Sequence, residues 1–183
     1  MPGRAKAVRA IVFAAAASVA VAGCSGGSDG SSSGGQKQQS LAADVPKGFD
    51  PCKDIPKSLM DSEGFIATSR KDTDGGGGIM WRGCGWVNRR EYTVSITTTN
   101  ITLERVRAKG FRDPQEFMIG SRHAMTTRQF GDHPACVADA EMKEGSLEIL
   151  LDNPPDSETP SSDSCELARS LLEKIAPLIP ANA

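Results

Sequence analysis

The sequence predicts an α+β domain, in which an antiparallel sheet of four to six strands is packed by helices near the N-terminal and C-terminal ends of the domain. Strand-length runs of alternating polar and apolar residues fill the middle of the chain. Segments with helical spacing and helix-start residues stand on either side of these runs. Four cysteines are spread over the same region, which predicts two disulfides in an exported protein.

The first 23 residues have the parts of a secretory signal peptide. Three basic residues precede an uncharged run of 13 residues at 10–22, and the run ends in Val21-Ala22-Gly23-Cys24, which resembles a lipobox. The run is shorter than the roughly 20 residues that a transmembrane helix needs. We therefore expect a signal peptide at 1–23 and a lipid on the Cys24 thiol. The alternative is a buried N-terminal helix that contains a cysteine.

Residues 24–43 have the composition of a flexible tether, because residues 25–35 are almost all Gly and Ser. Such a chain cannot bury enough apolar surface to fold. The remainder, 44–183, has the length of a single domain with one modest core. A lipid on Cys24 then predicts a location on the outer face of the cytoplasmic membrane, facing the cell wall.

The first part of the domain predicts a short helix, a loop and a β-hairpin. Asp54 is suited to cap the helix and Gly64 to stop it. A glycine-rich loop at 72–78 precedes two strands at 79–87 and 91–99. The second strand has one apolar face and one hydroxyl face, which we interpret as a solvated sheet surface; a ligand groove is the alternative. The hydroxyl residues are Thr93, Ser95 and Thr97.

The second part predicts further helices and a second hairpin. The expected segments are helices at 102–109 and 114–121, a strand at 124–130, and hairpin strands at 134–143 and 146–151. Glu144-Gly145 is a tight-turn pair and gives the clearest hairpin signal in the chain. The last helix begins at Asp163, with Glu166 three residues later as in a capping box, and Pro177 ends it.

The chain has five cysteines, and the assignment of Cys24 to a lipid leaves an even set for disulfides. The remaining four allow three pairings. We favour Cys52–Cys84 and Cys136–Cys165, because each pair joins neighbours in the sequence and ties a terminal helix to the sheet. The rival interpretation is a metal site of four thiolates, which the lack of a CxxC pair and an oxidising compartment disfavour.

The charge balance excludes one class of partner. The full chain has a net charge of −2, and loss of three basic residues with the signal peptide changes it to −5. An acidic domain without a basic patch binds nucleic acid poorly. We therefore expect no nucleic-acid partner, and the sequence predicts no cofactor and no metal.

Three short motifs support a family resemblance. Phe49-Asp50-Pro51-Cys52, Cys84-Gly85-Trp86 and the late Cys165-Glu166-Leu167-Ala168 resemble the DUF3558 family of actinobacterial proteins, many of them lipoproteins with a Ser/Gly-rich tether. The resemblance covers about Phe49 to Leu178. It implies an exported location, disulfides and an α+β domain. The family has no accepted reaction and no catalytic residues, so the resemblance implies no site.

No catalytic site is predicted. A nucleophilic site needs a base beside a Ser or Cys, and we interpret His123 and His133 as surface or core residues. Asp139 and Glu141 alternate on one strand face, which is the pattern of a glycosidase pair. Lys143 shares that face, so the prediction is a solvated surface in which these charges lie together in water.

The two tryptophans are assigned different roles. Trp81 and Trp86 are five residues apart, so they point to opposite faces of a regular strand. Trp86 shares the face of Cys84 and is expected to pack on the disulfide. Trp81 is therefore the candidate ligand contact.

These features favour a non-enzymatic binding module at the cell surface, which holds a protein partner or an envelope lipid or glycan. One alternative is a cell-envelope hydrolase whose site is assembled from loops. Another is an accessory subunit that stabilises a second exported protein. An apolar cavity of several hundred Å³ would favour a lipid or small-molecule ligand.

Overall fold

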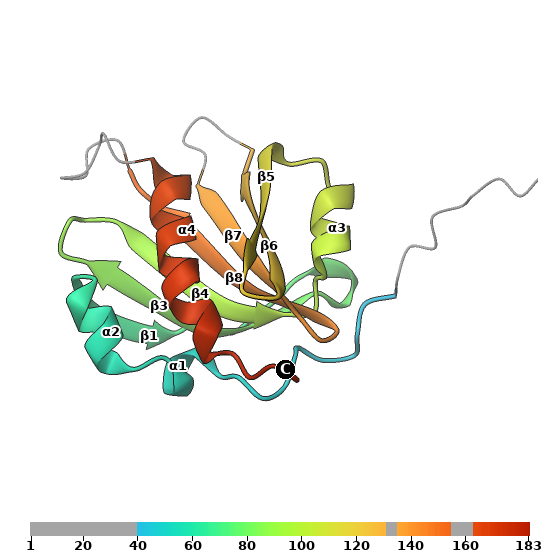
Figure 1. Ribbon diagram of the computed structural model, residues 1–183, viewed down its shortest axis with the longest axis horizontal. Helices are drawn as coiled ribbons and strands as arrows, with labels where there is room; N and C mark the ends of the chain where they lie inside the picture. The colour runs from blue at the N-terminus through green and yellow to red at the C-terminus, as the bar shows by residue number, and fades with distance from the viewer. Residues whose placement is uncertain (1–39, 131–134, 155–162) are drawn as a thin grey trace, which may run out of the picture. The chain divides into compact units, whose positions relative to one another are not determined.

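The computed structural model describes residues 40–130, 135–154 and 163–183 (Figure 1). The predicted signal peptide, Cys24 and His133 lie outside the described residues. The helices are α1 Pro51–Asp54, α2 Lys57–Ser62, α3 Leu103–Ala108 and α4 Ser164–Ile175. The strands are β1 Phe65–Arg70, β2 Thr73–Asp74, β3 Met80–Asn88, β4 Thr93–Thr99, β5 Arg112–Ile119, β6 Arg122–Arg128, β7 Cys136–Met142 and β8 Gly145–Asp152.

The strands form one antiparallel sheet in the order β1-β3-β4-β8-β7-β6-β5, and β2 pairs with the outer side of β3. The α+β class is therefore confirmed. The predicted count of four to six strands is wrong, because the described part of the chain has an eight-stranded sheet. The three strands that the sequence did not predict are β1, β2 and β5.

The strand β5 replaces a predicted helix at 114–121. Asp113 and Pro114 suggested a helix start, but they lie at an irregularity in the β5–β6 register between Arg112 and Gln115. Asp113 has φ of 49°. Because β5 is an edge strand, the missing N–H of Pro114 removes no hydrogen bond from the interior of the sheet.

The predicted helix near Asp54 is also different in detail. It is split into α1 and α2, and Asp54 lies in α1 instead of capping a helix. The residue that caps α1 is Asp50, whose side chain accepts a hydrogen bond from Cys52 N. Gly64 follows α2 with φ of 85°, as expected for a glycine that ends a helix.

Helices pack on both faces of the sheet. Figure 1 shows α4 lying across one face. Ala124 on β6 is buried with the residues of α4 in the main core, whereas the next residue, Met125, is buried with Leu103 and Val106 of α3. Since successive residues of a strand point to opposite faces, α3 lies on the face opposite α4. Ile96, Leu147 and Ile149 are fully buried in the main core.

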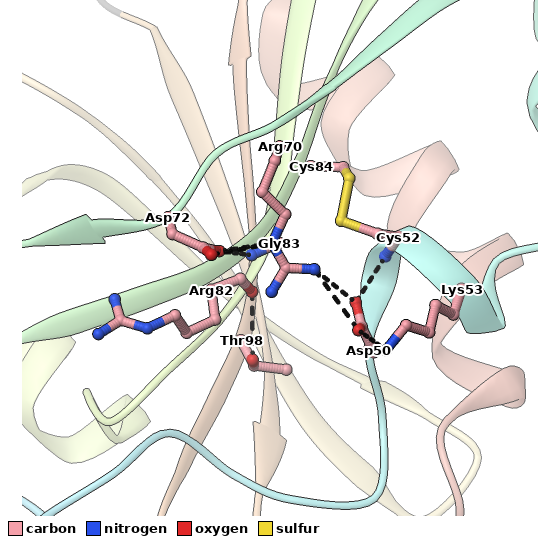
Figure 2. Close-up of a disulfide and its surroundings, with 9 residues drawn as sticks. All are labelled: Asp50, Cys52, Lys53, Arg70, Asp72, Arg82, Gly83, Cys84 and Thr98. Atoms are coloured by element: carbon pink, nitrogen blue, oxygen red, sulfur yellow. Dashed lines mark hydrogen bonds and ion pairs between the residues drawn. A yellow bond between two sulfur atoms is a disulfide. The ribbon is translucent and has the colours of Figure 1, made fainter.

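The first disulfide, Cys52–Cys84, joins α1 to β3 (Figure 2). Arg70 forms ion pairs with both Asp50 and Asp72 beside this disulfide. Asp72 also accepts a hydrogen bond from Gly83 N at 3.1 Å. In this motif Asp50 therefore caps α1, and Cys52 links the helix to β3. Both roles are structural and need no ligand.

The second disulfide, Cys136–Cys165, joins β7 to the first turn of α4. Asp163 caps this helix as predicted, with Oδ1 accepting from Cys165 N at 2.7 Å. Arg128 on β6 pairs with the same carboxylate. Burial raises the pKa of Asp163, but the hydrogen bond from Cys165 N and the ion pair with Arg128 outweigh this effect and lower the pKa.

Candidate functional site

A cleft of about 1010 Å³ opens where α3 begins and where β7 turns into β8. Residues 40–42, Thr102 with the first turns of α3, and the β7–β8 turn line it, together with one residue of β6. The lining is rich in charge and has no Phe, Trp or Tyr among the described residues. The ionisable lining residues are Glu104, Arg107, His123, Glu141, Lys143 and Glu144.

One wall of the cleft is held by Asn100, which is fully buried. Its Nδ2 donates to Ala42 O and to Gly78 O, both at 2.9 Å. Its Oδ1 accepts from Met80 N at 2.9 Å. Residues 40–43, which the sequence assigns to the tether, are thereby attached to the domain. The cleft wall is a fixed part of the fold.

The opposite side of the cleft is the β7–β8 turn. Glu144 has φ of 66°, and Gly145 begins β8. A Cβ on Gly145 would lie 2.0 Å from Thr99 O and 2.7 Å from Cγ of Pro46. Only glycine allows this close approach, so the turn, β4 and the segment after the tether pack tightly together.

The helix α3 contributes the third side. Thr102 caps it, with a long contact of 3.4 Å from Arg105 N to the threonine hydroxyl. Leu103 and Val106 are buried on the sheet. Glu104 and Arg107 each follow one of these buried residues, three positions apart on the helix, and both line the cleft.

The cleft carries an excess of unpaired acidic groups. Arg107 forms two hydrogen bonds with Glu116, at 2.7 and 3.1 Å. This pairing lowers the pKa of Glu116 and raises that of Arg107. The other charged lining residues form no ion pair within residues 40–130, 135–154 and 163–183. They are Glu104, Glu141, Glu144 and Lys143.

Trp81, the candidate ligand contact, does not line this cleft. Its Nε1–H donates to Glu148 Oε2 at 3.1 Å. Its ring packs against Gly75, where a Cβ would lie 2.8 Å away. A ligand role for Trp81 stays a prediction. Trp86 is buried in the same core cluster as Cys84.

The interpretation of Asp139 as part of a solvated face is wrong. Asp139 is only 1% exposed, whereas Glu141 is exposed and lines the cleft. The two carboxylates therefore do not converge on a common substrate. Asp139 instead lies directly opposite Glu148 on β8. Burial, and then the charge of Glu148, raise the pKa of Asp139 well above its ordinary value.

The hydroxyl face of β4 is only partly solvated. Thr97 is buried, whereas Thr93 is exposed and Ser95 is partly exposed. A shallow groove of about 260 Å³ runs beside Thr93 and Ser95, with Lys71 lying against Gly85 at its edge. This groove is much smaller than the cleft at α3.

The sequence did not predict the cleft. Glu104, Arg107 and Glu144 are ordinary surface charges in the sequence, and Asn100 has no motif around it. The signal that existed was the Glu144-Gly145 turn, which places a tight hairpin end beside α3. The cleft forms where residues 40–42, the start of α3 and the β7–β8 turn come together, and only the fold brings these distant segments into contact.

The model of the family described as protein of unknown function (DUF3558) matches residues 19–178. The chain belongs to the DUF3558 family. No curated protein and no solved structure matches the chain. Among the described residues of this DUF3558 protein, no helix is long and apolar enough to cross a membrane, and no group of three or more His, Cys, Asp or Glu residues is arranged to hold a metal.

Proposed function

We propose that this DUF3558 protein is a membrane-anchored extracytoplasmic lipoprotein, and that its domain is a non-enzymatic module that binds a protein partner in the cleft at α3. The anchor is a lipid on Cys24, at the outer face of the cytoplasmic membrane. Its support is the order of charge, apolar run and small residues before Cys24. The family match begins at residue 19, so this cysteine lies within the matched span.

The position of the cleft suits a module that works close to its anchor. Ser40 lines the cleft, so only residues 25–39 separate Cys24 from the binding surface. A flexible chain of that length and composition has a root-mean-square reach of roughly 20 Å. The proposed partner is therefore an envelope protein at the membrane surface.

The chemistry of the cleft favours a peptide segment with a basic side chain. Its unpaired acidic residues offer acceptors to a lysine or arginine, and a carboxylate pairs well with a guanidinium. A lipid chain would need an apolar cavity, whereas this cleft is lined by charged side chains. A glycan is less favoured, because the described lining has no aromatic ring for a sugar to pack on.

The charge of the cleft is the observation that carries this proposal, and charge reversal tests it. We would express the double variant Glu104→Lys/Glu141→Lys in the native envelope and recover the proteins that copurify with it after mild crosslinking. The matched control is Glu91→Lys/Glu166→Lys, which makes the same charge change at exposed positions outside the cleft lining. It also places one lysine in the first turn of a helix, as the test variant does.

The proposal predicts a partner that copurifies with the wild type and the control but is lost from the cleft variant. Equal recovery with both double variants would contradict binding in the cleft. An envelope hydrolase remains the alternative function. It would be favoured if the purified protein turned over a cell-wall substrate and Glu104→Lys/Glu141→Lys abolished that turnover.

A further inference from the structure

Two carboxylates face each other on the side of the sheet where α3 packs. Asp139 on β7 is the direct cross-strand partner of Glu148 on β8, and such partners have Cβ atoms about 4.5–5.5 Å apart. Asp139 is 1% exposed and Glu148 is partly buried. No basic side chain of the described chain influences the pKa of either group.

The hydrogen bonds around Asp139 suit a neutral acid better than a carboxylate. Its Oδ2 has no partner among the described residues, and neither has the buried hydroxyl of Thr127 on the next strand. Its Oδ1 lies 3.1 Å from Ser146 Oγ. An ionised Asp139 would thus be a buried charge with one donor, although a carboxylate has about four lone-pair sites.

Ser146 can serve only one of two acceptors at a time. Its Oγ lies 2.9 Å from Ile101 O and 3.1 Å from Asp139 Oδ1. A hydroxyl has a single proton. When Ser146 donates to Ile101 O, its oxygen is free to accept a hydrogen bond from the O–H of a neutral Asp139. When Asp139 is ionised, the carboxylate attracts the serine proton, and Ile101 O loses its donor.

We propose that the acid pair is a pH-sensitive switch, in which a protonated Asp139 donates a hydrogen bond to Ser146 Oγ, and release of the Asp139 proton to water turns the Ser146 hydroxyl from Ile101 O to Asp139. The only covalent bond that is broken is the O–H bond of Asp139. Ser146 keeps its own proton and changes only its direction.

The electrostatics around the pair agree with this arrangement. Burial, followed by the charge of Glu148, raises the pKa of Asp139, and the bond to Ser146 opposes them. Burial also raises the pKa of Glu148, against the bond from Trp81. None of the charged groups on α3, β5, β6 and the rest of β7 shifts the pKa of Asp139. They are Glu104, Arg105 and Arg107 on α3, Arg112, Asp113 and Glu116 on β5, Arg122, His123 and Arg128 on β6, and Glu141 on β7.

The switch connects the acid pair to the cleft. Ile101 precedes Thr102, the capping residue of α3, and the first turn of α3 forms a wall of the cleft. Loss of the Ser146 bond loosens this turn as the pH rises. The consequence for a partner in the cleft, weaker binding at higher pH, rests on the proposed function.

Nuclear magnetic resonance of the full-length protein in detergent tests the switch without any partner. The readouts, followed between about pH 4 and pH 9, are the side-chain carboxyl shift of Asp139, the Trp81 indole N–H shift and hydrogen-exchange protection of the Arg105 and Val106 amides. We expect Asp139 to titrate well above the ordinary aspartate range. Protection in α3 should fall by about fivefold over the same interval, as expected for the loss of one hydrogen bond.

Three variants separate the steps. Asp139→Asn should make protection in α3 independent of pH. Ser146→Ala should do the same while Asp139 still titrates, and this variant decides the outcome if the first does not fold. The control Asp152→Asn removes an exposed carboxylate from the same strand as Glu148 and should keep the wild-type profile.

An ordinary titration of Asp139, or a wild-type pH profile in Asp139→Asn or Ser146→Ala, would overturn the proposal. Because every readout is taken without a partner, such a failure leaves binding in the cleft untouched. Failure of the charge-reversal experiment would in turn leave the switch standing.

Discussion

Replacement of Asn100 by alanine tests how the cleft is held together. The side chain makes three hydrogen bonds to the backbone, to Met80, Ala42 and Gly78, and is fully buried. Each such bond contributes about 0.5–1.5 kcal/mol net. Ala42 lines the cleft, so its freed carbonyl regains water, and we expect Asn100→Ala to lower the free energy of unfolding by about 2–4 kcal/mol.

Asn100→Ala should also have a local effect that hydrogen exchange can detect. The segment around Ala42 loses its tie to the domain, so its amide hydrogens should exchange much faster than in the wild type. Urea unfolding at 25 °C measures the stability, and hydrogen–deuterium exchange of residues 40–46 measures the local effect.

Asn88 supplies a matched control. It is also buried and bridges the backbone, with Nδ2 donating to Glu63 O at 2.7 Å and Oδ1 accepting from Arg90 N at 2.9 Å. Asn88→Ala should lower stability by a similar amount but leave exchange at 40–46 unchanged under native conditions. Equal exchange in the two variants, or a loss below about 0.5 kcal/mol for Asn100→Ala, would refute the role assigned to Asn100.

Three other perturbations have expected outcomes. Replacement of both Cys136 and Cys165 by serine should lower the free energy of unfolding by about 2–5 kcal/mol in urea, because the closed loop between them is released in the unfolded chain. Gly145→Ala should lower the Tm strongly through its clash with Thr99 O, whereas Gly76→Ala, with no atom within 4 Å of the added Cβ, should change it little. The raised pKa of Asp139 means that the folded state binds this proton more tightly than the unfolded state, so its contribution to stability falls as pH rises from the ordinary aspartate pKa to the raised one. The free energy of unfolding of Asp139→Asn minus that of the wild type should therefore increase with pH in urea titrations, and a constant difference would contradict the buried carboxyl.

Local patterns in the sequence predicted the elements that local chemistry determines. The Glu144-Gly145 pair predicted the β7–β8 hairpin, although the turn residues are Lys143 and Glu144 and Gly145 already pairs with Met142. The cap at Asp163 predicted the start of α4. The favoured cysteine pairs are the two disulfides of the structure, because each helix that carries a cysteine packs on the strand that carries its partner.

The errors arose where tertiary position overrides local signals. Pro114 suggested a helix start, but an edge strand with an irregular register accepts it equally well. Asp139 alternates with other charges as a surface residue would, yet α3 packs on that face of the sheet and buries it. The sequence did not reveal that Glu148 is its cross-strand partner, because a turn at Glu144-Gly145 would place Leu150 opposite Asp139, whereas the turn is one residue earlier.

The cleft at α3 is proposed to bind an envelope protein at the membrane surface. Photo-crosslinking in living cells tests this proposal most directly, with a photoreactive amino acid in place of exposed Lys143 in the cleft lining and, as a control, in place of exposed Lys57 on α2. The proposal predicts one envelope protein crosslinked from position 143, absent from position 57 and lost when Glu104→Lys/Glu141→Lys is added. The same product from both positions, or its survival in the charge-reversed background, would contradict the claim.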